Sequence, residues 1–303
     1  MAERIVLTHG CSLSNLPLFV AEGAGLFADE GLSVEVPVFS NLSSTAEILA
    51  SGAADLGTMA FTQPLVDAYQ PIRSVIVAGS GLMGIAILAQ PSIRGMSGLR
   101  GRKVGTFRSD PLEVLLYDKS RTAGMTFDDL EIEYLDDVEA AIQSFRDGRL
   151  AAITLAEPHG MRVRDMGAVE LSDGTELWGN PFPDTVLVAT EQFLTSKPQA
   201  VAAAIRAMLR AERAIVADPR GALEHVSKHY PGYARELLER GARRQPPCID
   251  IRPFVPTIYG RWSSLQALAL VPREAARPDV VALDLLGAEL GRVTGPGIKV
   301  ANA

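Results

Sequence analysis

Strands and helices alternate along much of the chain, and this order limits the possible folds more than any other feature. Arg4–Thr8 is a short run rich in β-branched residues, Leu16–Glu22 has the apolar spacing of a helix, and Leu32–Val38 alternates apolar and polar residues like a half-buried strand. A helix that begins at Pro111 follows the strand predicted at Lys103–Thr106. Strands that alternate with helices form parallel sheets, so the sequence predicts an α/β protein.

The length of the chain indicates more than one domain. A chain of 303 residues is long for a single hydrophobic core and fits two domains. Short apolar runs at Gly84–Ala89 and Thr185–Thr190 are suited to carry the chain from one lobe to the other and back. From Lys197 onward the pattern is helical. We therefore predict two lobes, each a mostly parallel sheet flanked by helices.

The charge and the cysteines argue against several classes of function. The net charge is −7 and Lys and Arg are scattered, so the chain lacks the basic surface that binds nucleic acid. Cys11 and Cys248 lie far apart in the sequence and lack the spacing of zinc ligands or of a disulfide framework. We expect no metal and no cofactor, and no segment that spans a membrane.

The first residues leave the cellular compartment open. MAERIVLTHG has neither the long apolar run nor the small-residue cleavage site of a secretory signal. The protein is periplasmic or at the cell surface if a signal peptide has been removed, and cytoplasmic if Met1 is the native start.

Five segments in a fixed order carry a resemblance to a known family. They are Pro17–Glu35, Leu49–Gly57, Leu99–Gly105, Ala140–Ile153 and the pair Glu157-Pro158. Their order and spacing resemble those of the nitrate/sulfonate/taurine and thiamine-precursor group of ABC-transporter substrate-binding proteins, known as SsuA/THI5-like proteins. The resemblance covers most of the chain.

The resemblance implies a two-lobed periplasmic-binding-protein fold of type II with the ligand cleft between the lobes. One lobe would comprise residues 1–86 and 190–303, and the other residues 87–189. The function implied is capture of a small anionic or polar organic molecule by hinge closure, for ABC-type uptake. The ligand would be a sulfonate, a carboxylate, a heteroaromatic acid or a pyrimidine. The expected partners are this ligand and an ABC permease, and the expected state is a monomer.

Polar residues that follow the predicted strands are the candidate ligand contacts, because ligands of open α/β sheets bind beyond the carboxyl ends of the strands. The candidates that precede the first crossing are Cys11, Ser12, Asn41, Ser43, Ser44, Thr45, Thr58 and Phe61. The later candidates are Arg108, Ser109, Asp110, Glu157 and Asp184.

Two of these segments would suit an anionic ligand. Ser43–Thr45 places hydroxyls and free backbone amides at a predicted helix start, which either seats an anion or simply caps the helix. Arg108 could bind an acidic group in bidentate fashion, or instead pair with Asp110 or face solvent. Glu157 would lie at the cleft rim or hold its lobe together.

Cys11 supports a second hypothesis, in which the protein is an enzyme. His9 lies two residues earlier, and strand periodicity would put both side chains on one side, where the imidazole could activate the thiol. The segment THGCSLSNLPL is similar to the opening loop of aromatic sulfinate desulfinase, which implies a cytoplasmic desulfinase- or decarboxylase-like enzyme acting on an aromatic acid. The further His and Arg of that enzyme are missing from the following loops. The alternative role of Cys11 is packing against the ligand.

Overall fold

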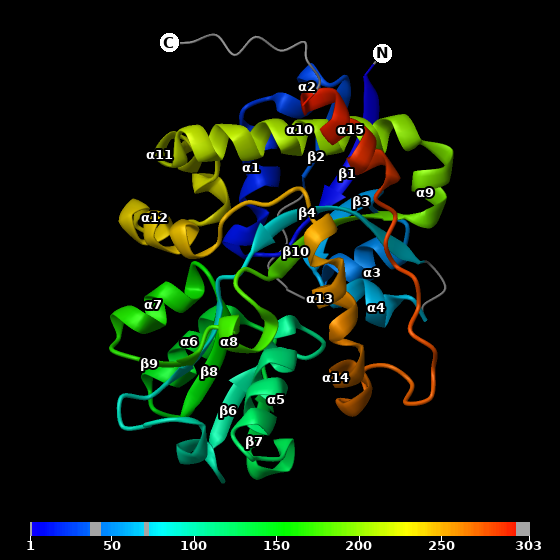
Figure 1. Ribbon diagram of the computed structural model, residues 1–303. Coiled ribbons are helices and arrows are strands. Elements are labelled where there is room, and N and C mark those ends of the chain that lie inside the picture. The colour runs from blue at the N-terminus through cyan, green and yellow to red at the C-terminus, as the bar shows by residue number, and fades with distance from the viewer. Residues whose placement is uncertain (1, 37–43, 70–72, 295–303) are drawn as a thin grey trace.

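The computed structural model describes residues 2–36, 44–69 and 73–294 and contains two five-stranded sheets (Figure 1). The first sheet has the order β2-β1-β3-β10-β4. Its strands are β1 (Glu3–Thr8), β2 (Leu32–Glu35), β3 (Leu56–Ala60), β4 (Ser74–Leu82) and β10 (Pro183–Thr190). β1 runs parallel to β2 and β3, whereas β10 runs antiparallel to β3 and β4.

The second sheet repeats this arrangement with the order β7-β6-β8-β5-β9. Its strands are β5 (Ile85–Ala89), β6 (Lys103–Thr106), β7 (Glu131–Tyr134), β8 (Ala152–Ala156) and β9 (Val169–Ser172). β6 is parallel to β7 and β8, and β5 is antiparallel to β8 and β9. The predicted two-lobed α/β fold is therefore confirmed, and each sheet is mixed because one strand that connects the lobes runs against the others.

Helices flank both sheets. Those before β10 are α1 (Leu16–Gly23), α2 (Leu26–Asp29), α3 (Ser44–Ala50), α4 (Gln63–Asp67), α5 (Pro111–Thr122), α6 (Val138–Arg146), α7 (His159–Asp165) and α8 (Thr175–Trp178). Those after it are α9 (Glu191–Ser196), α10 (Pro198–Ala217), α11 (Pro219–Ala222), α12 (Arg235–Arg244), α13 (Val255–Gly260), α14 (Trp262–Ala267) and α15 (Asp284–Thr294). In the described residues no helix is both long and apolar enough to cross a membrane.

The long helix α10 covers the first sheet and is shaped for close packing. Its buried face carries mostly alanines, including Ala204, Ala207 and Ala211, which are completely buried. Small side chains let neighbouring elements approach closely, and α10 contacts α1, α2 and α15 (Figure 1). The C-terminal helices therefore complete the lobe that the N-terminal strands begin.

The chain changes sheets at two adjacent places. Met83 and Gly84 connect β4 to β5, and both have positive φ, 58° and 76°. Met83 N donates to Phe182 O at 3.0 Å, so the outgoing and returning chains are hydrogen-bonded to each other. The crossing expected at Thr185–Thr190 is instead part of β10 in the first sheet, because the return occurs before Pro183. The division into one lobe of residues 1–86 and 190–303 and another of residues 87–189 stays a prediction.

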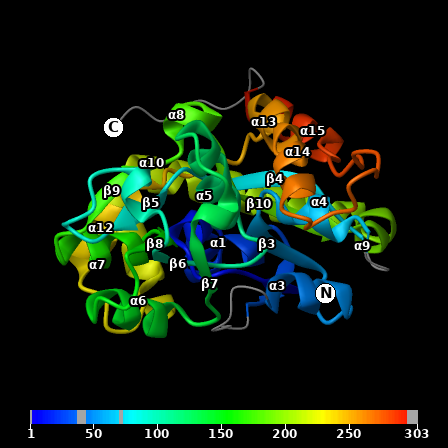
Figure 2. The same ribbon diagram turned by 90° about the horizontal axis from the view of Figure 1, so that it is seen from below.

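The C-terminal segment returns to the second sheet after covering the first. α14 packs against α5, and Asp118 of α5 accepts hydrogen bonds from Arg261 Nη1 and Ser264 Oγ, each at 2.6 Å. The Arg261 guanidinium also lies over the Trp178 ring, 5.3 Å from its centroid. Figure 2 shows this orange segment on the opposite side of the molecule from α6 and α7. The two lobes are thus joined by more than the two crossings.

Candidate ligand-binding cleft

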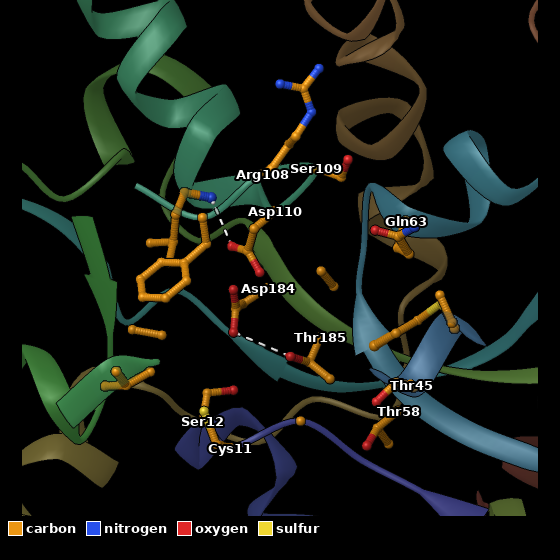
Figure 3. Close-up of a pocket in the computed structure, with 18 of the residues that line it drawn as sticks. Cys11, Ser12, Thr45, Thr58, Gln63, Arg108, Ser109, Asp110, Asp184 and Thr185 are labelled. Carbon is orange, nitrogen blue, oxygen red and sulfur yellow. Dashed lines mark hydrogen bonds between the residues drawn. The ribbon is translucent and has the colours of Figure 1, made fainter. Parts of the chain in front are cut away.

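A cavity of about 600 Å³ lies between the two sheets and is lined by both (Figure 3). The cavity lies beyond the carboxyl ends of four strands, which line it directly or through the loops that follow them: β1, β3, β6 and β8. Ligands of open α/β sheets usually bind at such strand ends. The lining from the first sheet and its helices includes Cys11, Ser12, Asn15, Thr45, Thr58, Met59, Gln63, Asp67, Asp184 and Thr185. The lining from the second includes Phe107, Arg108, Ser109, Asp110, Leu112, Asp136, Leu155 and His159.

Hydroxyl groups form a buried chain on the first-sheet side. Ser14 Oγ lies 2.5 Å from Ser12 Oγ and 2.5 Å from Thr185 Oγ1, and Thr58 donates to the amide oxygen of Asn15. Thr45 differs from these, because its Oγ1 has no hydrogen-bond partner among the described residues although Thr45 is only 3% exposed. A buried polar atom without a partner is costly, so Thr45 indicates where a bound molecule would supply one.

Two carboxylates face each other across the cleft. Asp110 caps the N-terminus of α5, and its Oδ1 accepts from Leu112 N at 2.9 Å. Asp184 lies on β10, where its Oδ2 accepts from Gln245 Nε2 at 2.8 Å and from Thr185 Oγ1 at 3.2 Å. Figure 3 shows both carboxylates pointing into the space between the sheets.

Burial dominates the titration of both groups. Desolvation raises the pKa of Asp110 to about 7, and the nearby Asp184 and Glu113 add to the rise. Desolvation also raises the pKa of Asp184 to about 6, against the lowering effect of its neutral hydrogen-bond donors. Each carboxylate is therefore held in the cleft with its charge poorly compensated.

Arg108 does not neutralise these acids. Its side chain is exposed, and its guanidinium lies 5.0 Å from the centroid of the Tyr134 ring. Figure 3 shows the guanidinium pointing away from Asp110. The pairing with Asp110 that the sequence left open is therefore absent. Ser109, between them, has a positive φ of 63°, and its N–H donates to Glu113 Oε2 at 2.7 Å.

The structure brings most of the predicted contact residues to one cavity. Those that line it are Cys11, Ser12, Thr45, Thr58, Arg108, Ser109, Asp110 and Asp184. Asn41 and Ser43 lie outside the described residues, as does the side chain of Ser44, the first residue of α3. The anion seat predicted at Ser43–Thr45 thus stays a prediction. Ligand contact by the lining residues is likewise still a prediction.

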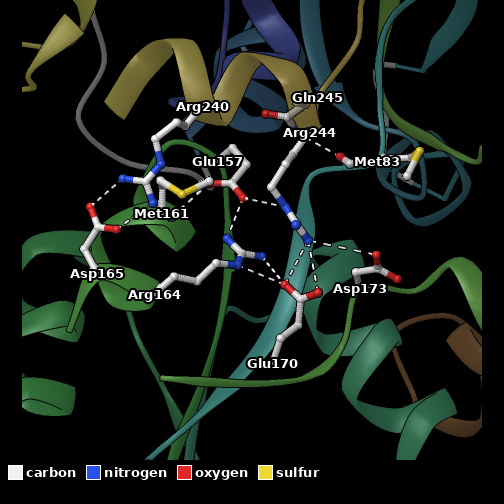
Figure 4. Close-up of polar contacts among 10 residues, drawn as sticks. All are labelled: Met83, Glu157, Met161, Arg164, Asp165, Glu170, Asp173, Arg240, Arg244 and Gln245. Carbon is white, nitrogen blue, oxygen red and sulfur yellow. Dashed lines mark hydrogen bonds and ion pairs between the residues drawn. The ribbon is translucent and has the colours of Figure 1, made fainter. Parts of the chain in front are cut away.

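Phe61 and Glu157 are placed elsewhere. Phe61 is completely buried and packs edge-to-face on Trp178, with ring centroids 5.7 Å apart, so it belongs to the core. Glu157 is also completely buried and does not lie at the cleft rim. Its Oε1 accepts from Arg164 Nη1 at 2.6 Å and lies 3.4 Å from Arg244 Nε (Figure 4). The structural role considered for Glu157 is the one that its position favours.

The predicted pair of His9 and Cys11 is absent, because β1 ends at Thr8 and strand periodicity does not extend to Cys11. His9 Nδ1 lies 2.7 Å from Gly10 O, and the His9 ring packs against Phe19 and His229. In the described part of the chain, His9 Nε2 has no hydrogen-bond partner. Burial raises the pKa of the Cys11 thiol to about 12, and the nearby Asp110 adds to the rise. The thiol is thus protonated near neutral pH, which is the opposite of an activated nucleophile.

Several lining residues were not predicted from the sequence. Gln63 and Asp67 come from α4, a helix of five residues that is too short to give a clear periodic pattern. His159 follows the Glu157-Pro158 pair and lies with its Nε2 3.3 Å from Cys11 O and its Nδ1 2.5 Å from Tyr233 Oη. Burial lowers the pKa of His159 to about 4, so its ring is neutral. In the described part of the chain, no group of three or more His, Cys, Asp or Glu is placed to hold a metal ion.

Comparison with known proteins gives one family and one fold. The family model described as NMT1/THI5 like matches residues 13–222. A 4-amino-5-hydroxymethyl-2-methylpyrimidine phosphate synthase from Uromyces fabae is 28% identical over 242 residues, 75% of this chain and 70% of that protein.

Two solved structures are similar over nearly the whole chain. The alkanesulfonate-binding protein SsuA from Xanthomonas axonopodis pv. citri, bound to MOPS, matches with a TM-score of 0.79 and 18% identity over 93% of this chain and 100% of its own. The periplasmic nitrate-binding protein NrtA from Synechocystis PCC 6803 matches with a TM-score of 0.83 and 13% identity over 97% of this chain and 89% of its own. At these identities the likeness shows the fold.

Proposed function

Because the chain belongs to the NMT1/THI5-like family, we propose that it captures a small organic molecule between its two lobes and delivers it to an ABC permease for uptake. The observation that carries the proposal is the cavity of about 600 Å³ between the sheets, to which both sheets contribute polar and apolar side chains. A ligand in this position would contact both lobes at once and so favour their closed arrangement.

The unpartnered Thr45 hydroxyl supports binding at this place. It lies on α3 at the cavity wall, and a ligand atom could supply the hydrogen bond that no described residue gives it. SsuA, which has the same fold, was solved with MOPS bound. That likeness supports capture of a small molecule without specifying which one.

Hinge closure would take place around the two crossings. Met83 and Gly84 use left-handed backbone conformations there, and Met83 is hydrogen-bonded to the returning chain at Phe182. Gln245, at the end of α12, donates to Met83 O at 3.0 Å and to Asp184 Oδ2 at 2.8 Å. A cleft carboxylate and a crossing residue therefore share one amide, which would couple occupancy of the cleft to the hinge.

The proposal is tested by screening a panel of organic acids, amines, sulfonates and heteroaromatic compounds by thermal shift. A true ligand stabilises the folded protein by mass action and is recovered chemically unchanged in mass spectrometry. Thr45→Val should weaken its binding, whereas Thr195→Val, on exposed helix α9, should leave it unchanged. A ligand that stabilises both variants and the native protein equally would place binding outside this cleft.

Catalysis in the same cleft is the second candidate function, supported by the relative that is named as a synthase at 28% identity. The two candidates differ in the fate of the ligand. If the stabilising compound is recovered as a product of different mass, and its conversion requires a cleft residue, the protein is an enzyme. Recovery of the unchanged compound after prolonged incubation supports capture.

A further inference from the structure

We propose that the captured ligand carries a basic nitrogen that binds between the carboxylates of Asp110 and Asp184. The proposal rests on the function proposed above and specifies the chemical class of the ligand. Where the sequence led us to expect an anionic or polar ligand, the proposed ligand is cationic.

The charges that line the cleft have one predominant sign. In the described part of the cavity wall, the acidic residues are Glu47, Asp67, Asp110, Asp136 and Asp184. Arg108 is the one Arg or Lys in that wall, and its guanidinium lies over Tyr134. His159 is neutral because burial lowers its pKa to about 4. A ligand with a negative group would thus meet mainly carboxylates.

Asp110 and Asp184 lack a cationic partner among the described residues. Asp110 accepts a hydrogen bond from the backbone N–H of Leu112. Asp184 accepts from the Gln245 amide and from the hydroxyls of Thr185 and Ser14. All of these donors are neutral. A carboxylate that is buried, like Asp184, or partly buried, like Asp110, is stabilised by pairing with a cation, and neither of these has one among the described residues.

A basic nitrogen would supply the missing pairing from both lobes at once. Asp110 caps a helix of the second lobe, and Asp184 lies on a strand of the first sheet. An ammonium or amidinium between them would hold the lobes together with charge-assisted hydrogen bonds, which are the strong ones. An anion in the same position would add repulsion, because the charge of Asp184 already raises the pKa of Asp110.

The rest of the cavity favours a ligand with an apolar body and a second polar group. Phe107, Leu112 and Leu155 line the wall and are almost completely buried, so they offer apolar surface beside Asp110. The Thr45 hydroxyl, which no described residue hydrogen-bonds, lies in the same cavity (Figure 3) and could bind a polar substituent of the ligand. The Thr45 hydroxyl is a separate observation from the two carboxylates, and it also indicates that a ligand binds in this cavity.

Four benzene derivatives of similar shape test the charge preference on the full chain by isothermal titration calorimetry near neutral pH. They are benzamidine, which is cationic, benzamide, which is neutral, and benzoate and benzenesulfonate, which are anionic. We expect benzamidine to bind at least tenfold more tightly than benzamide, and the two anions to bind more weakly still.

Substitutions test whether Asp110 and Asp184 cause the preference for a cationic ligand. Asp110→Asn and Asp184→Asn keep the shape of the side chain and should each weaken benzamidine binding by about tenfold or more. Asp128→Asn, at an exposed position, is the matched control and should leave the affinity unchanged. Circular dichroism and the melting temperature of each variant establish that it is folded.

Three results would overturn the inference. These are tighter binding of benzoate or benzenesulfonate than of benzamidine, unchanged benzamidine affinity in both cleft variants, and absence of benzamidine binding at millimolar concentration. None of them overturns the capture of a small molecule, because the thermal-shift panel contains compounds of every charge. An anion that stabilises the protein in that panel would retain the proposed function and remove the basic nitrogen.

Discussion

Arg164 Nη1 donates to Oε1 of Glu157 at 2.6 Å, and the Glu157 side chain is completely buried. Glu157 also accepts from Met161 N at 2.9 Å, and Arg244 of α12 lies 3.4 Å away (Figure 4). Glu170 of β9 contacts both guanidinium groups. These contacts join the C-terminal helices of one lobe to the other lobe beside the crossings.

Arg164→Met should destabilise the protein by about 2–4 kcal/mol, measured as the free energy of unfolding in urea. Removing Arg164 leaves the buried Glu157 with the more distant Arg244 as its remaining cationic partner among the described residues, and a buried charge that is only partly compensated is expensive. Arg240→Met is the control, because Arg240 and Asp165 form an exposed pair that should be worth at most about 1 kcal/mol.

A double variant separates charge from packing in this network. Glu157→Gln combined with Arg164→Met removes the buried charge together with its partner, and it should recover part of the stability lost in the single variant. If Arg164→Met and Arg240→Met lose the same amount, the burial of Glu157 has no energetic consequence and this account of the network is wrong.

Gly84→Ala should destabilise the protein more than Gly101→Ala does. Both glycines have left-handed φ, 76° and 62°, which costs any L residue about 1–2 kcal/mol. An added Cβ at Gly84 would lie 2.8 Å from the Gln245 side chain, whereas nothing lies within 4 Å at Gly101. The comparison therefore isolates the contact at the crossing. Equal melting temperatures for the two variants would show that Gln245 moves aside freely.

The sequence predicts strands and turns better than it predicts which side chains meet. The helix expected from Pro111 begins there, because proline at the first helical position and a capping aspartate before it are local features. The pairing of His9 with Cys11 failed because it assumed that β1 continues past Thr8. Periodicity says where a side chain points only as long as the strand lasts.

Contacts between residues far apart in the sequence explain the other differences between prediction and structure. Glu157 was expected at the cleft rim because it follows a strand, but its partner Arg244 comes from a helix 87 residues later in the sequence. The opposition of Asp110 and Asp184 likewise depends on how two sheets face each other, which no local pattern encodes. The sequence pointed to both residues separately and could not reveal that they form an acidic pair.

Asp110→Asn should stabilise the ligand-free protein at about pH 8 by roughly 1–3 kcal/mol, because asparagine keeps the helix cap and removes a partly buried charge. The pKa of Asp110 is raised from 3.8 to about 7 by burial, with contributions from Asp184 and Glu113. Its contribution to stability is thus fully present below about pH 4 and is lost as the pH rises through about 7. The advantage of the variant should shrink toward zero near pH 4.

Urea unfolding of both proteins across this pH range measures the difference. Asp137→Asn is the matched control, since Asp137 caps α6 by accepting from Ala140 N at 2.7 Å but is exposed. Its effect should be small at every pH. A stability difference for Asp110→Asn that does not change between about pH 4 and pH 8 would contradict the raised pKa.

Cys11 should react slowly with iodoacetamide at about pH 8, although its side chain is partly open to the cleft. The thiolate is the reacting species, and burial together with the nearby Asp110 raises the pKa of the thiol to about 12. A Cys248→Ser protein leaves Cys11 as the single thiol, and its labelling should be at least a hundredfold slower when folded than in urea, where the pKa is ordinary. The rate for the folded protein should rise steeply with pH.

Cys11→Ser should still capture the ligand found in the thermal-shift panel. Rapid labelling of folded Cys11, together with loss of function in Cys11→Ser, would instead support the enzyme hypothesis, because a thiol that is both accessible and ionised is what nucleophilic catalysis requires.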